Sequence, residues 1–127
     1  MKVLLVDDSS TMRKIQKNAL KGMAFEEIKE AENGRAAIDI LKEINFEVSF
    51  MICDINMPIM SGIEALKEIR AMPAGQDLPI LMCTSVADKG QVIEAIKSGA
   101  NGYVVKPFKP DELCAKVTDL IEKFNIK

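Results

Sequence analysis

Histidine is absent from this chain of 127 residues. Without an imidazole side chain, histidine-based acid–base catalysis, catalytic triads and histidine metal sites are excluded, and any phosphohistidine must be supplied by another protein. Only three cysteines occur, and none has the Cys-X-X-Cys spacing of a zinc site or a redox motif. We therefore interpret the cysteines as small hydrophobic residues in a reducing compartment.

Long hydrophobic runs and an excess of positive charge are also missing. Each apolar run is far shorter than the roughly 20 residues of a transmembrane helix, and the first residues do not resemble a signal sequence. We therefore expect a cytoplasmic protein that does not interact with membranes. The formal net charge is −2 and the 17 lysines and arginines are scattered, so nucleic acid is not an expected partner.

Short apolar runs alternate along the chain with segments of helical period. Four of the runs are continuously apolar, which is typical of strands covered on both faces, whereas the run at 28–31 is more polar and predicts an edge strand. The predicted strands are residues 3–6, 28–31, 50–53, 80–83 and 103–105. The predicted helices are residues 12–23, 35–44, 63–72, 88–97 and 110–124. This alternation predicts one α/β domain with a parallel sheet between two helical layers.

Polar side chains follow four of the predicted strands at the point where each strand ends. The carboxyl ends of parallel strands meet at one crevice, so these side chains are expected to converge. They are Asp7 and Asp8, Asp54, Thr84 and Lys106. Three carboxylates, a hydroxyl and an ammonium group are the parts of a magnesium-dependent phosphoryl-acceptor site.

Each group has a chemical role in such a site. Asp54 is the candidate nucleophile, because a carboxylate can take a phosphoryl group to form an acyl phosphate. Asp7 and Asp8 would hold Mg²⁺, which prefers carboxylate oxygens, while Lys106 and Thr84 would stabilise the phosphoryl oxygens. Taken singly, an Asp-Asp pair after a strand is more often a turn or a helix cap. The functional interpretation rests on four strand ends that supply what one reaction needs.

These motifs resemble the receiver domains of two-component response regulators. The resembling stretches are Leu5-Val-Asp-Asp-Ser-Ser10, Asp54-Ile-Asn-Met-Pro-Ile-Met-Ser-Gly62, Cys83-Thr-Ser85 and Gly99-Ala-Asn-Gly-Tyr-Val-Val-Lys-Pro-Phe108. The resemblance covers essentially the whole chain and implies a single receiver domain over residues 1–127. It also implies a doubly wound, flavodoxin-like sheet of five parallel strands in the order 2-1-3-4-5.

The resemblance implies a role for each site residue. Asp54 accepts a phosphoryl group from a histidine kinase, so the protein is a phosphoacceptor that assists its own phosphorylation and dephosphorylation rather than an ordinary enzyme. Asp8 and Asp54 bind Mg²⁺ together with the backbone carbonyl of Asn56, and Asp7 acts largely through water. The bond between Lys106 and Pro107 is expected to be cis, a form that X-Pro bonds tolerate.

Within this family, residues 10–15 and 102–108 are most similar to stand-alone chemotaxis regulators that act on the flagellar motor. That similarity implies a monomer with a histidine kinase and a motor switch protein as partners, and a phosphatase as a further candidate partner. In these regulators Tyr103 turns inward on phosphorylation, and the partner binds a face formed by Lys89, Val92, Tyr103, Val105 and Lys116. Val86 departs from the charged or polar residue that influences dephosphorylation in many relatives, which leaves the lifetime of the phosphoryl group open.

Three other functions remain as alternatives. A phosphorelay intermediate, or another stand-alone receiver, would share the chemistry and differ in its partner. A magnesium-dependent phosphatase with an aspartate nucleophile would need an acid two residues after Asp54, and Asn56 cannot protonate a leaving group. A flavin mononucleotide carrier would need a phosphate-binding loop after the first strand, where Asp7 and Asp8 would repel the phosphate.

Overall fold

The computed structural model describes residues 1–85 and 89–126, and these residues contain a five-stranded parallel sheet. The strand order is β2-β1-β3-β4-β5, which confirms the predicted fold class, topology and edge position of the strand near residue 30. The strands are β1 (Lys2–Val6), β2 (Glu27–Ala31), β3 (Phe50–Asp54), β4 (Ile80–Ser85) and β5 (Gly102–Lys106).

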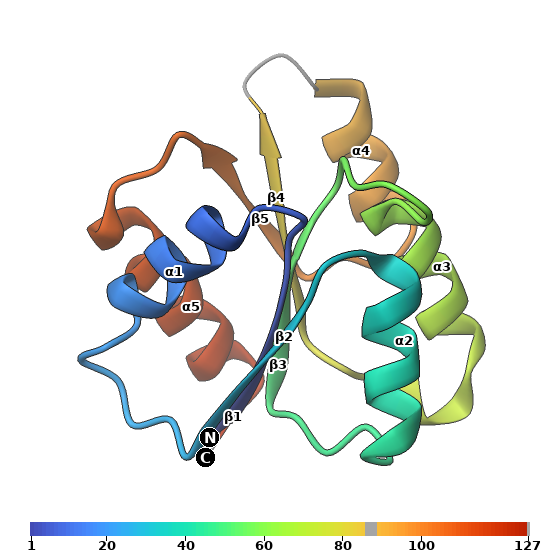
Figure 1. The fold of residues 1–127 in the computed structure, drawn as a ribbon, viewed down its shortest axis with the longest axis horizontal. Coiled ribbons are helices and arrows are strands. Elements are labelled where there is room, and N and C mark those ends of the chain that lie inside the picture. Colours follow the sequence, from blue (N-terminus) through green and yellow to red (C-terminus); the bar gives the residue numbers. More distant parts are fainter. Residues whose placement is uncertain (86–88, 127) are drawn as a thin grey trace.

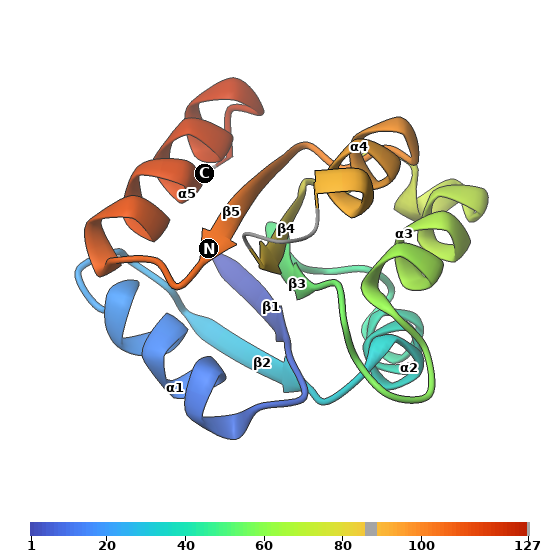
Figure 2. The same cartoon turned by 90° about the horizontal axis from the view of Figure 1, so that it is seen from above.

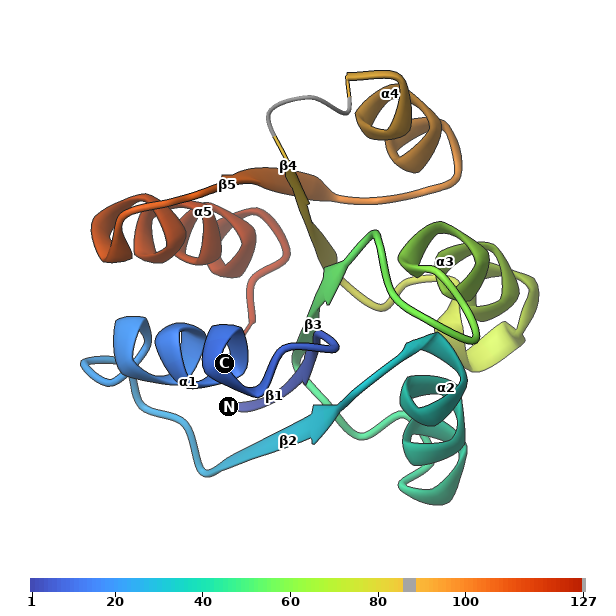
Figure 3. The same ribbon diagram turned by 45° about the horizontal axis from the view of Figure 1, so that its top comes forward.

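Two layers of helices enclose the sheet (Figure 1). Helices α1 and α5 cover one face, and α2, α3 and α4 cover the other (Figure 2). In Figure 3, α4 lies at the margin of the second layer, beyond β4. The helices are α1 (Ser10–Ala19), α2 (Gly34–Glu43), α3 (Gly62–Ala71), α4 (Lys89–Lys97) and α5 (Pro110–Lys123), with a short 3₁₀ helix, η1 (Pro73–Gly75), after α3. In the described part of the chain, no helix combines the length and the apolar character needed to span a membrane.

The hydrophobic core has two halves, one on each face of the sheet. Successive residues of a strand point to opposite faces, and both faces here are covered, which explains the continuous apolar runs. Toward α1 and α5 the central strands point Val3, Leu5, Phe50, Ile52, Leu81 and Cys83. Toward α2 and α3 they point Leu4, Val6, Met51, Cys53, Ile80 and Met82.

The two buried cysteines therefore lie on opposite faces of the sheet. Cys53 and Cys83 each precede a site residue, Asp54 and Thr84, on neighbouring strands, a placement that by itself suggests adjacent thiols, but the register between the strands separates them. In the parallel register Cys53 lies beside Met82, and Cys83 lies beside Asp54, and a one-residue offset reverses the face. Burial raises the pKa of Cys83 to about 12 and also raises the pKa of Cys53, so both thiols stay protonated and act as core residues.

Helix α1 begins and ends earlier than the periodicity predicted. Ser9 is its N-cap, because the Ser9 hydroxyl accepts a hydrogen bond from the backbone N–H of Met12 at 3.1 Å. After Ala19, the backbone N–H groups of Lys21 and Met23 donate to carbonyls three residues back, which is the pattern of turns rather than of an α-helix. Residue 88, predicted to open the fourth helix, lies outside the described residues.

Candidate functional site

The carboxyl ends of β1 and β3 bring three carboxylates together. One oxygen from each of Asp7, Asp8 and Asp54 lies within 4.8 Å of the others. Asp7 is fully buried and Asp54 is 7% exposed, whereas Asp8 is exposed. The cluster thus has a buried floor and one carboxylate that is open to solvent.

Lys106, the last residue of β5, reaches across the sheet to two of these carboxylates. Its Nζ lies 2.9 Å from Oδ2 of Asp7 and 3.1 Å from Oδ1 of Asp54. Burial by itself lowers the pKa of Lys106, but the hydrogen bond to Asp7 and the charges of both carboxylates outweigh it and raise the pKa. Lys106 is therefore a permanent cation at the floor of the site.

Asp54 presents its two oxygens in different environments. Its Oδ1 accepts hydrogen bonds from Lys106 and from the backbone N–H of Ile55 at 2.9 Å. No hydrogen bond from the described residues reaches Oδ2, which is thus the oxygen left for a reaction. Burial raises the pKa of Asp54, the charge of Lys106 opposes this effect, and the negative charge of Asp7 adds to it.

Asp7 is held in place by the start of α1. Its Oδ1 accepts the backbone N–H of Ser9 at 2.9 Å, an Asx-type turn, and its Oδ2 accepts from Lys106. Arg13 donates to the backbone carbonyl of Asp7 and pairs with Glu30 on β2 at 2.8 Å. Both carboxylate oxygens of Asp7 are therefore occupied by the protein itself.

The loop from β3 to α3 packs tightly against Asp54. The Gly62 N–H donates to the Ile55 carbonyl at 2.8 Å, and a Cβ atom on Gly62 would lie 2.0 Å from the backbone oxygen of Asp54. Only glycine fits at this close approach. In the same loop, Oδ1 of Asn56 accepts a hydrogen bond from Nε2 of Gln91 on α4 at 3.3 Å.

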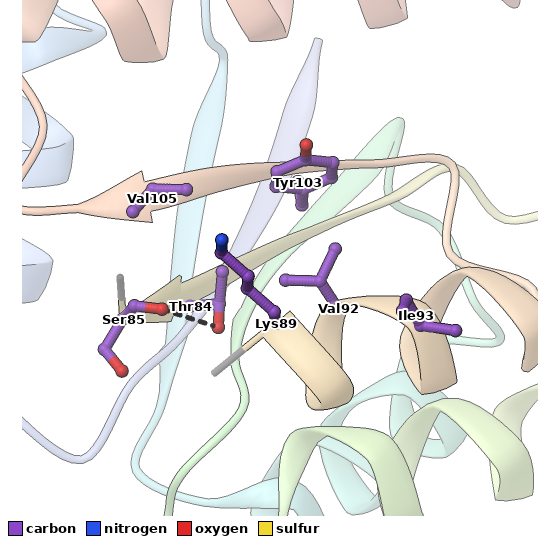
Figure 4. A pocket seen from close by; sticks show the side chains of 7 residues that line it. All are labelled: Thr84, Ser85, Lys89, Val92, Ile93, Tyr103 and Val105. Atoms are coloured by element: carbon purple, nitrogen blue, oxygen red, sulfur yellow. Dashed lines mark hydrogen bonds between the residues drawn. The ribbon is translucent and has the colours of Figure 1, made fainter. Parts of the chain in front are cut away.

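Beside the carboxylate cluster is a pocket of about 420 Å³ between β4, β5 and α4 (Figure 4). Its lining consists of Thr84, Ser85, Lys89, Val92, Ile93, Tyr103 and Val105. Thr84 is buried, and its hydroxyl donates to the Ser85 carbonyl at 3.4 Å. The Tyr103 side chain is on β5, with its hydroxyl directed away from Thr84 in Figure 4, and the residue is 39% exposed. Nζ of Lys116 lies 5.6 Å from the centroid of the Tyr103 ring.

The structure places the predicted site residues in two neighbouring groups. Asp7, Asp8, Asp54 and Lys106 form the carboxylate cluster, and four of the five predicted partner-face residues line the pocket, with Lys116 beside Tyr103. Thr84 faces the pocket and donates to the backbone of Ser85 rather than to a carboxylate. The Lys106–Pro107 bond is cis, as the resemblance implied, and Val86 lies outside the described residues.

Some residues at these sites were not singled out in the sequence. Ile93 lines the pocket because it is four residues from Lys89, on the same face of α4, so helical spacing alone could have identified it. Gly62 was named only as the end of a family motif, and its close approach to the backbone of Asp54 was not foreseen. Gln91 gave no comparable signal, because it contacts Asn56 in a loop that is distant in sequence.

Comparison with known proteins identifies the class of protein to which this five-stranded fold and its acidic cluster belong. A family model described as "Response regulator receiver domain" matches residues 3–118, and the chain belongs to this family. It is 46% identical over 121 residues to a chemotaxis protein CheY homolog of Campylobacter jejuni, covering 95% of this chain and 92% of that protein. It is 45% identical over 125 residues to the chemotaxis protein CheY of Pseudomonas aeruginosa, covering 98% of this chain and 99% of that protein.

Solved structures give the same assignment. The chemotaxis response regulator CheY4 of Vibrio cholerae superimposes with a TM-score of 0.83 at 34% identity, covering 94% of this chain and 97% of that chain. A putative response regulator from Chloroflexus aurantiacus superimposes with a TM-score of 0.87 at 31% identity, covering 95% and 97%. The protein is thus a CheY-like receiver domain of two-component signalling.

Proposed function

We propose that this protein is a phosphorylation-activated switch in which Asp54 accepts a phosphoryl group from the phosphohistidine of a histidine kinase. The observation that carries the proposal is the position of Lys106, whose Nζ contacts both Asp7 and Asp54 inside a cluster of three carboxylates. A cation held against a buried nucleophile is the arrangement that phosphoryl transfer requires, because the transferred group brings several negative oxygens.

In the proposed reaction Oδ2 of Asp54 attacks the phosphorus atom. The bond between phosphorus and the kinase imidazole nitrogen breaks, and its electron pair remains on that nitrogen. The product is an acyl phosphate on Asp54. Oδ1 stays hydrogen-bonded to the Ile55 N–H, which fixes the orientation of the carboxylate. Lys106 is close enough to Asp54 to contact the new phosphoryl oxygens and to stabilise their negative charge.

The carboxylate cluster also fits a magnesium ion. Receiver domains bind Mg²⁺ at an acidic pocket, and here Asp8 and Asp54 offer oxygens together with the backbone carbonyl of Asn56. Asp7 would act through water, in keeping with the engagement of both its oxygens by Ser9 and Lys106. The ion, when bound, offsets the mutual repulsion of the carboxylates and the charge of the phosphoryl group.

The proposed output is a change at the surface formed by α4, β5 and α5. A phosphoryl group adds about −1.5 to −2 charges beside β4, and Thr84 carries the neighbouring hydroxyl. If Thr84 exchanges its bond to Ser85 for one to the phosphoryl group, Tyr103 can turn into the space beside β4. We propose a flagellar motor switch protein as the partner that reads this change, because the relatives named above are chemotaxis proteins.

Two alternatives differ from this proposal in testable ways. A phosphorelay intermediate would pass the phosphoryl group to a second histidine protein, and it is distinguished by its partner. An aspartate-nucleophile phosphatase would hydrolyse phosphate esters rapidly, but Asn56 occupies the position of the acid that such an enzyme needs.

The proposal predicts that phosphorylation requires a divalent ion held by Asp8. With a small acyl-phosphate donor, the protein should become phosphorylated in Mg²⁺ and not in excess chelator. Asp8→Ala should weaken Mg²⁺ binding at least about tenfold, because even indirect supports of a metal site cost that much. Asp119→Ala, which removes an exposed acid of α5, is the control and should leave the affinity unchanged. Equal Mg²⁺ affinities for the two variants would contradict the proposed site.

A further inference from the structure

The direction of the Asp8 side chain is set by the backbone alone. Asp8 is exposed, and no hydrogen bond from the described residues reaches its carboxylate. Asp7 differs, because its backbone N–H donates to the Ala31 carbonyl at 3.1 Å and its carboxylate is bonded to Ser9 and Lys106. The orientation of Asp8 therefore depends on the peptide unit that joins it to Asp7.

This peptide unit is held by Arg13 of α1. Nη1 of Arg13 donates to the backbone carbonyl of Asp7, and the Arg13 side chain is only 12% exposed. A peptide unit is planar, so the N and Cα atoms of Asp8 lie in one plane with this carbonyl. Any rotation of the Asp7 carbonyl therefore turns the Asp8 carboxylate as well.

Glu30 of β2 holds the guanidinium group of Arg13 from another side. Nε of Arg13 donates to Oε1 of Glu30 at 2.8 Å. Because a guanidinium group is planar and rigid, bonds made by two of its nitrogens fix its orientation. Lys17, one turn further along α1, pairs with Oε2 of the same carboxylate at 3.0 Å. Lys17 thus shares the acidic partner of Arg13 and has no bond to the carbonyl of Asp7 among those that Lys17 makes.

We propose that Arg13 is a positioning residue that orients Asp8 for the metal ion by holding the carbonyl of Asp7. The inference rests on the proposed magnesium site and adds a residue of α1 to it. The charge of Arg13 has the opposite effect, because a cation near three carboxylates repels Mg²⁺ and its removal would tighten binding. The sign of the change in affinity therefore separates positioning from charge.

The test is a Mg²⁺ titration of the full chain, followed through the backbone amide NMR signals of Asp8 and Ile55. Arg13→Met removes the donors and retains an unbranched side chain. We expect it to weaken Mg²⁺ binding about tenfold, as is typical when an indirect support of a metal site is lost. Arg13→Lys keeps the charge but lacks the rigid fork that bonds to the carbonyl and to Glu30 together, so it should also weaken binding, by a smaller factor.

Lys17→Met is the matched control on the same helix. It removes the same charge and a bond to the same carboxylate, and it leaves the contact between Arg13 and Asp7 in place. Its Mg²⁺ affinity should stay within about twofold of the wild type, because a distant charge acts only through a screened field.

A second readout is made without metal. The NMR shift of the Asp7 carbonyl carbon reports the hydrogen bond from Arg13, so it should move in both Arg13 variants and remain unchanged in Lys17→Met. Unchanged or tighter Mg²⁺ binding in Arg13→Met would overturn the inference, as would equal weakening in Lys17→Met. Failure of the metal site itself has a different signature, because the Asp8 and Ile55 amides of the wild type would then not respond to Mg²⁺.

Discussion

At the scale of single residues, Lys106 and Thr84 have different roles in the proposed switch: Lys106 supplies a positive charge, and Thr84 supplies a hydroxyl that can change its hydrogen-bond partner. Lys106 contacts two carboxylates and remains cationic, so it supplies attraction for a phosphoryl group without needing to change state. Thr84 is uncharged, buried and bonded only loosely, at 3.4 Å, to Ser85. A weak bond of this kind is readily exchanged for a charge-assisted bond to a phosphoryl oxygen.

The role of Thr84 can be followed through Tyr103, because the chain has one tyrosine and no tryptophan. The intrinsic fluorescence of the protein therefore reports on the surroundings of Tyr103 alone. Adding beryllium fluoride, a phosphoryl mimic, with Mg²⁺ should change the fluorescence of the wild type as the partly exposed ring turns inward. In Thr84→Ala most of this change should disappear, because the hydroxyl that leaves the pocket is no longer there.

Thr118→Ala is the matched control, since Thr118 is an exposed threonine on α5. This variant should respond like the wild type. If Thr84→Ala gave the full fluorescence change, Thr84 would not control Tyr103, and the proposed output step would be wrong even with Asp54 as the phosphoryl acceptor.

At the scale of elements, loops and helix starts set the site geometry more than the strands do. Helix α3 begins with a capping box in which Ser61 and Glu64 satisfy each other's backbone N–H groups, which anchors the end of the loop after Asp54. Gly62 follows directly and touches the backbone of Asp54. The strand positions Asp54, and the backbone N–H of Ile55, the first residue of the loop, holds Oδ1 of its carboxylate at 2.9 Å.

Substituting Gly62 should therefore damage the site through the backbone. Gly62→Ala places a methyl group against the Asp54 carbonyl, and we expect a loss of about 1–3 kcal/mol in the free energy of unfolding. Gly22→Ala is the control, because a Cβ there has nothing within 4 Å, and it should be neutral or slightly stabilising. Urea unfolding of both variants measures the difference, and equal stabilities would contradict the tight packing of this loop.

Helix α1 is connected to β2 by a charge cluster whose contribution depends on pH. Hydrogen bonds from Lys17 and then Arg13 lower the pKa of Glu30. A lowered pKa in the folded state adds stability above the ordinary glutamate pKa of about 4.3, and this stability disappears as the pH falls through the folded-state value. The Glu30 side chain is 35% exposed, so solvent screening limits the contribution to below about 1 kcal/mol.

Glu30→Gln should accordingly reduce the free energy of unfolding at pH 7, and its difference from the wild type should shrink as the pH is lowered below about 4. Glu27→Gln is the control on the same strand, because Glu27 is more exposed and lies 3.8 Å from Lys29. Urea unfolding at several pH values provides the comparison. A difference for Glu30→Gln that stayed constant with pH would show that the charges are not its cause.

At the scale of the whole molecule, the sequence predicted the architecture well because the three central strands, β1, β3 and β4, are buried on both faces. A continuous apolar run followed by a short polar residue is readily recognised, and four such strands with one more polar strand, alternating with helices, leave few possible topologies. The strand order itself came from the family resemblance. The ends of α1 were misjudged because Ser9, Ser10 and Thr11 can all cap a helix, and only the folded loop selects Ser9.

Contacts between elements were the part that sequence patterns could not predict. The offset between β3 and β4 places Cys83 beside Asp54, and a one-residue offset has no signature in either strand. The bond between Gln91 of α4 and Asn56 of the loop after β3 joins residues 35 positions apart, and no local pattern in either segment indicates it. Grouping Asp7, Asp8, Asp54 and Lys106 was possible because all follow strands of one parallel sheet, so the topology alone brings them together.

The most direct test of the central claim is to locate the phosphoryl group. The wild type is incubated with Mg²⁺ and a small acyl-phosphate donor, and the modified residue is mapped by mass spectrometry, with Asp54→Asn treated in parallel. We predict a single modification on Asp54 and none in the variant, because Asp54 is the carboxylate with Lys106 in contact and an oxygen left for reaction. Modification of Asp54→Asn at the wild-type level would contradict the account.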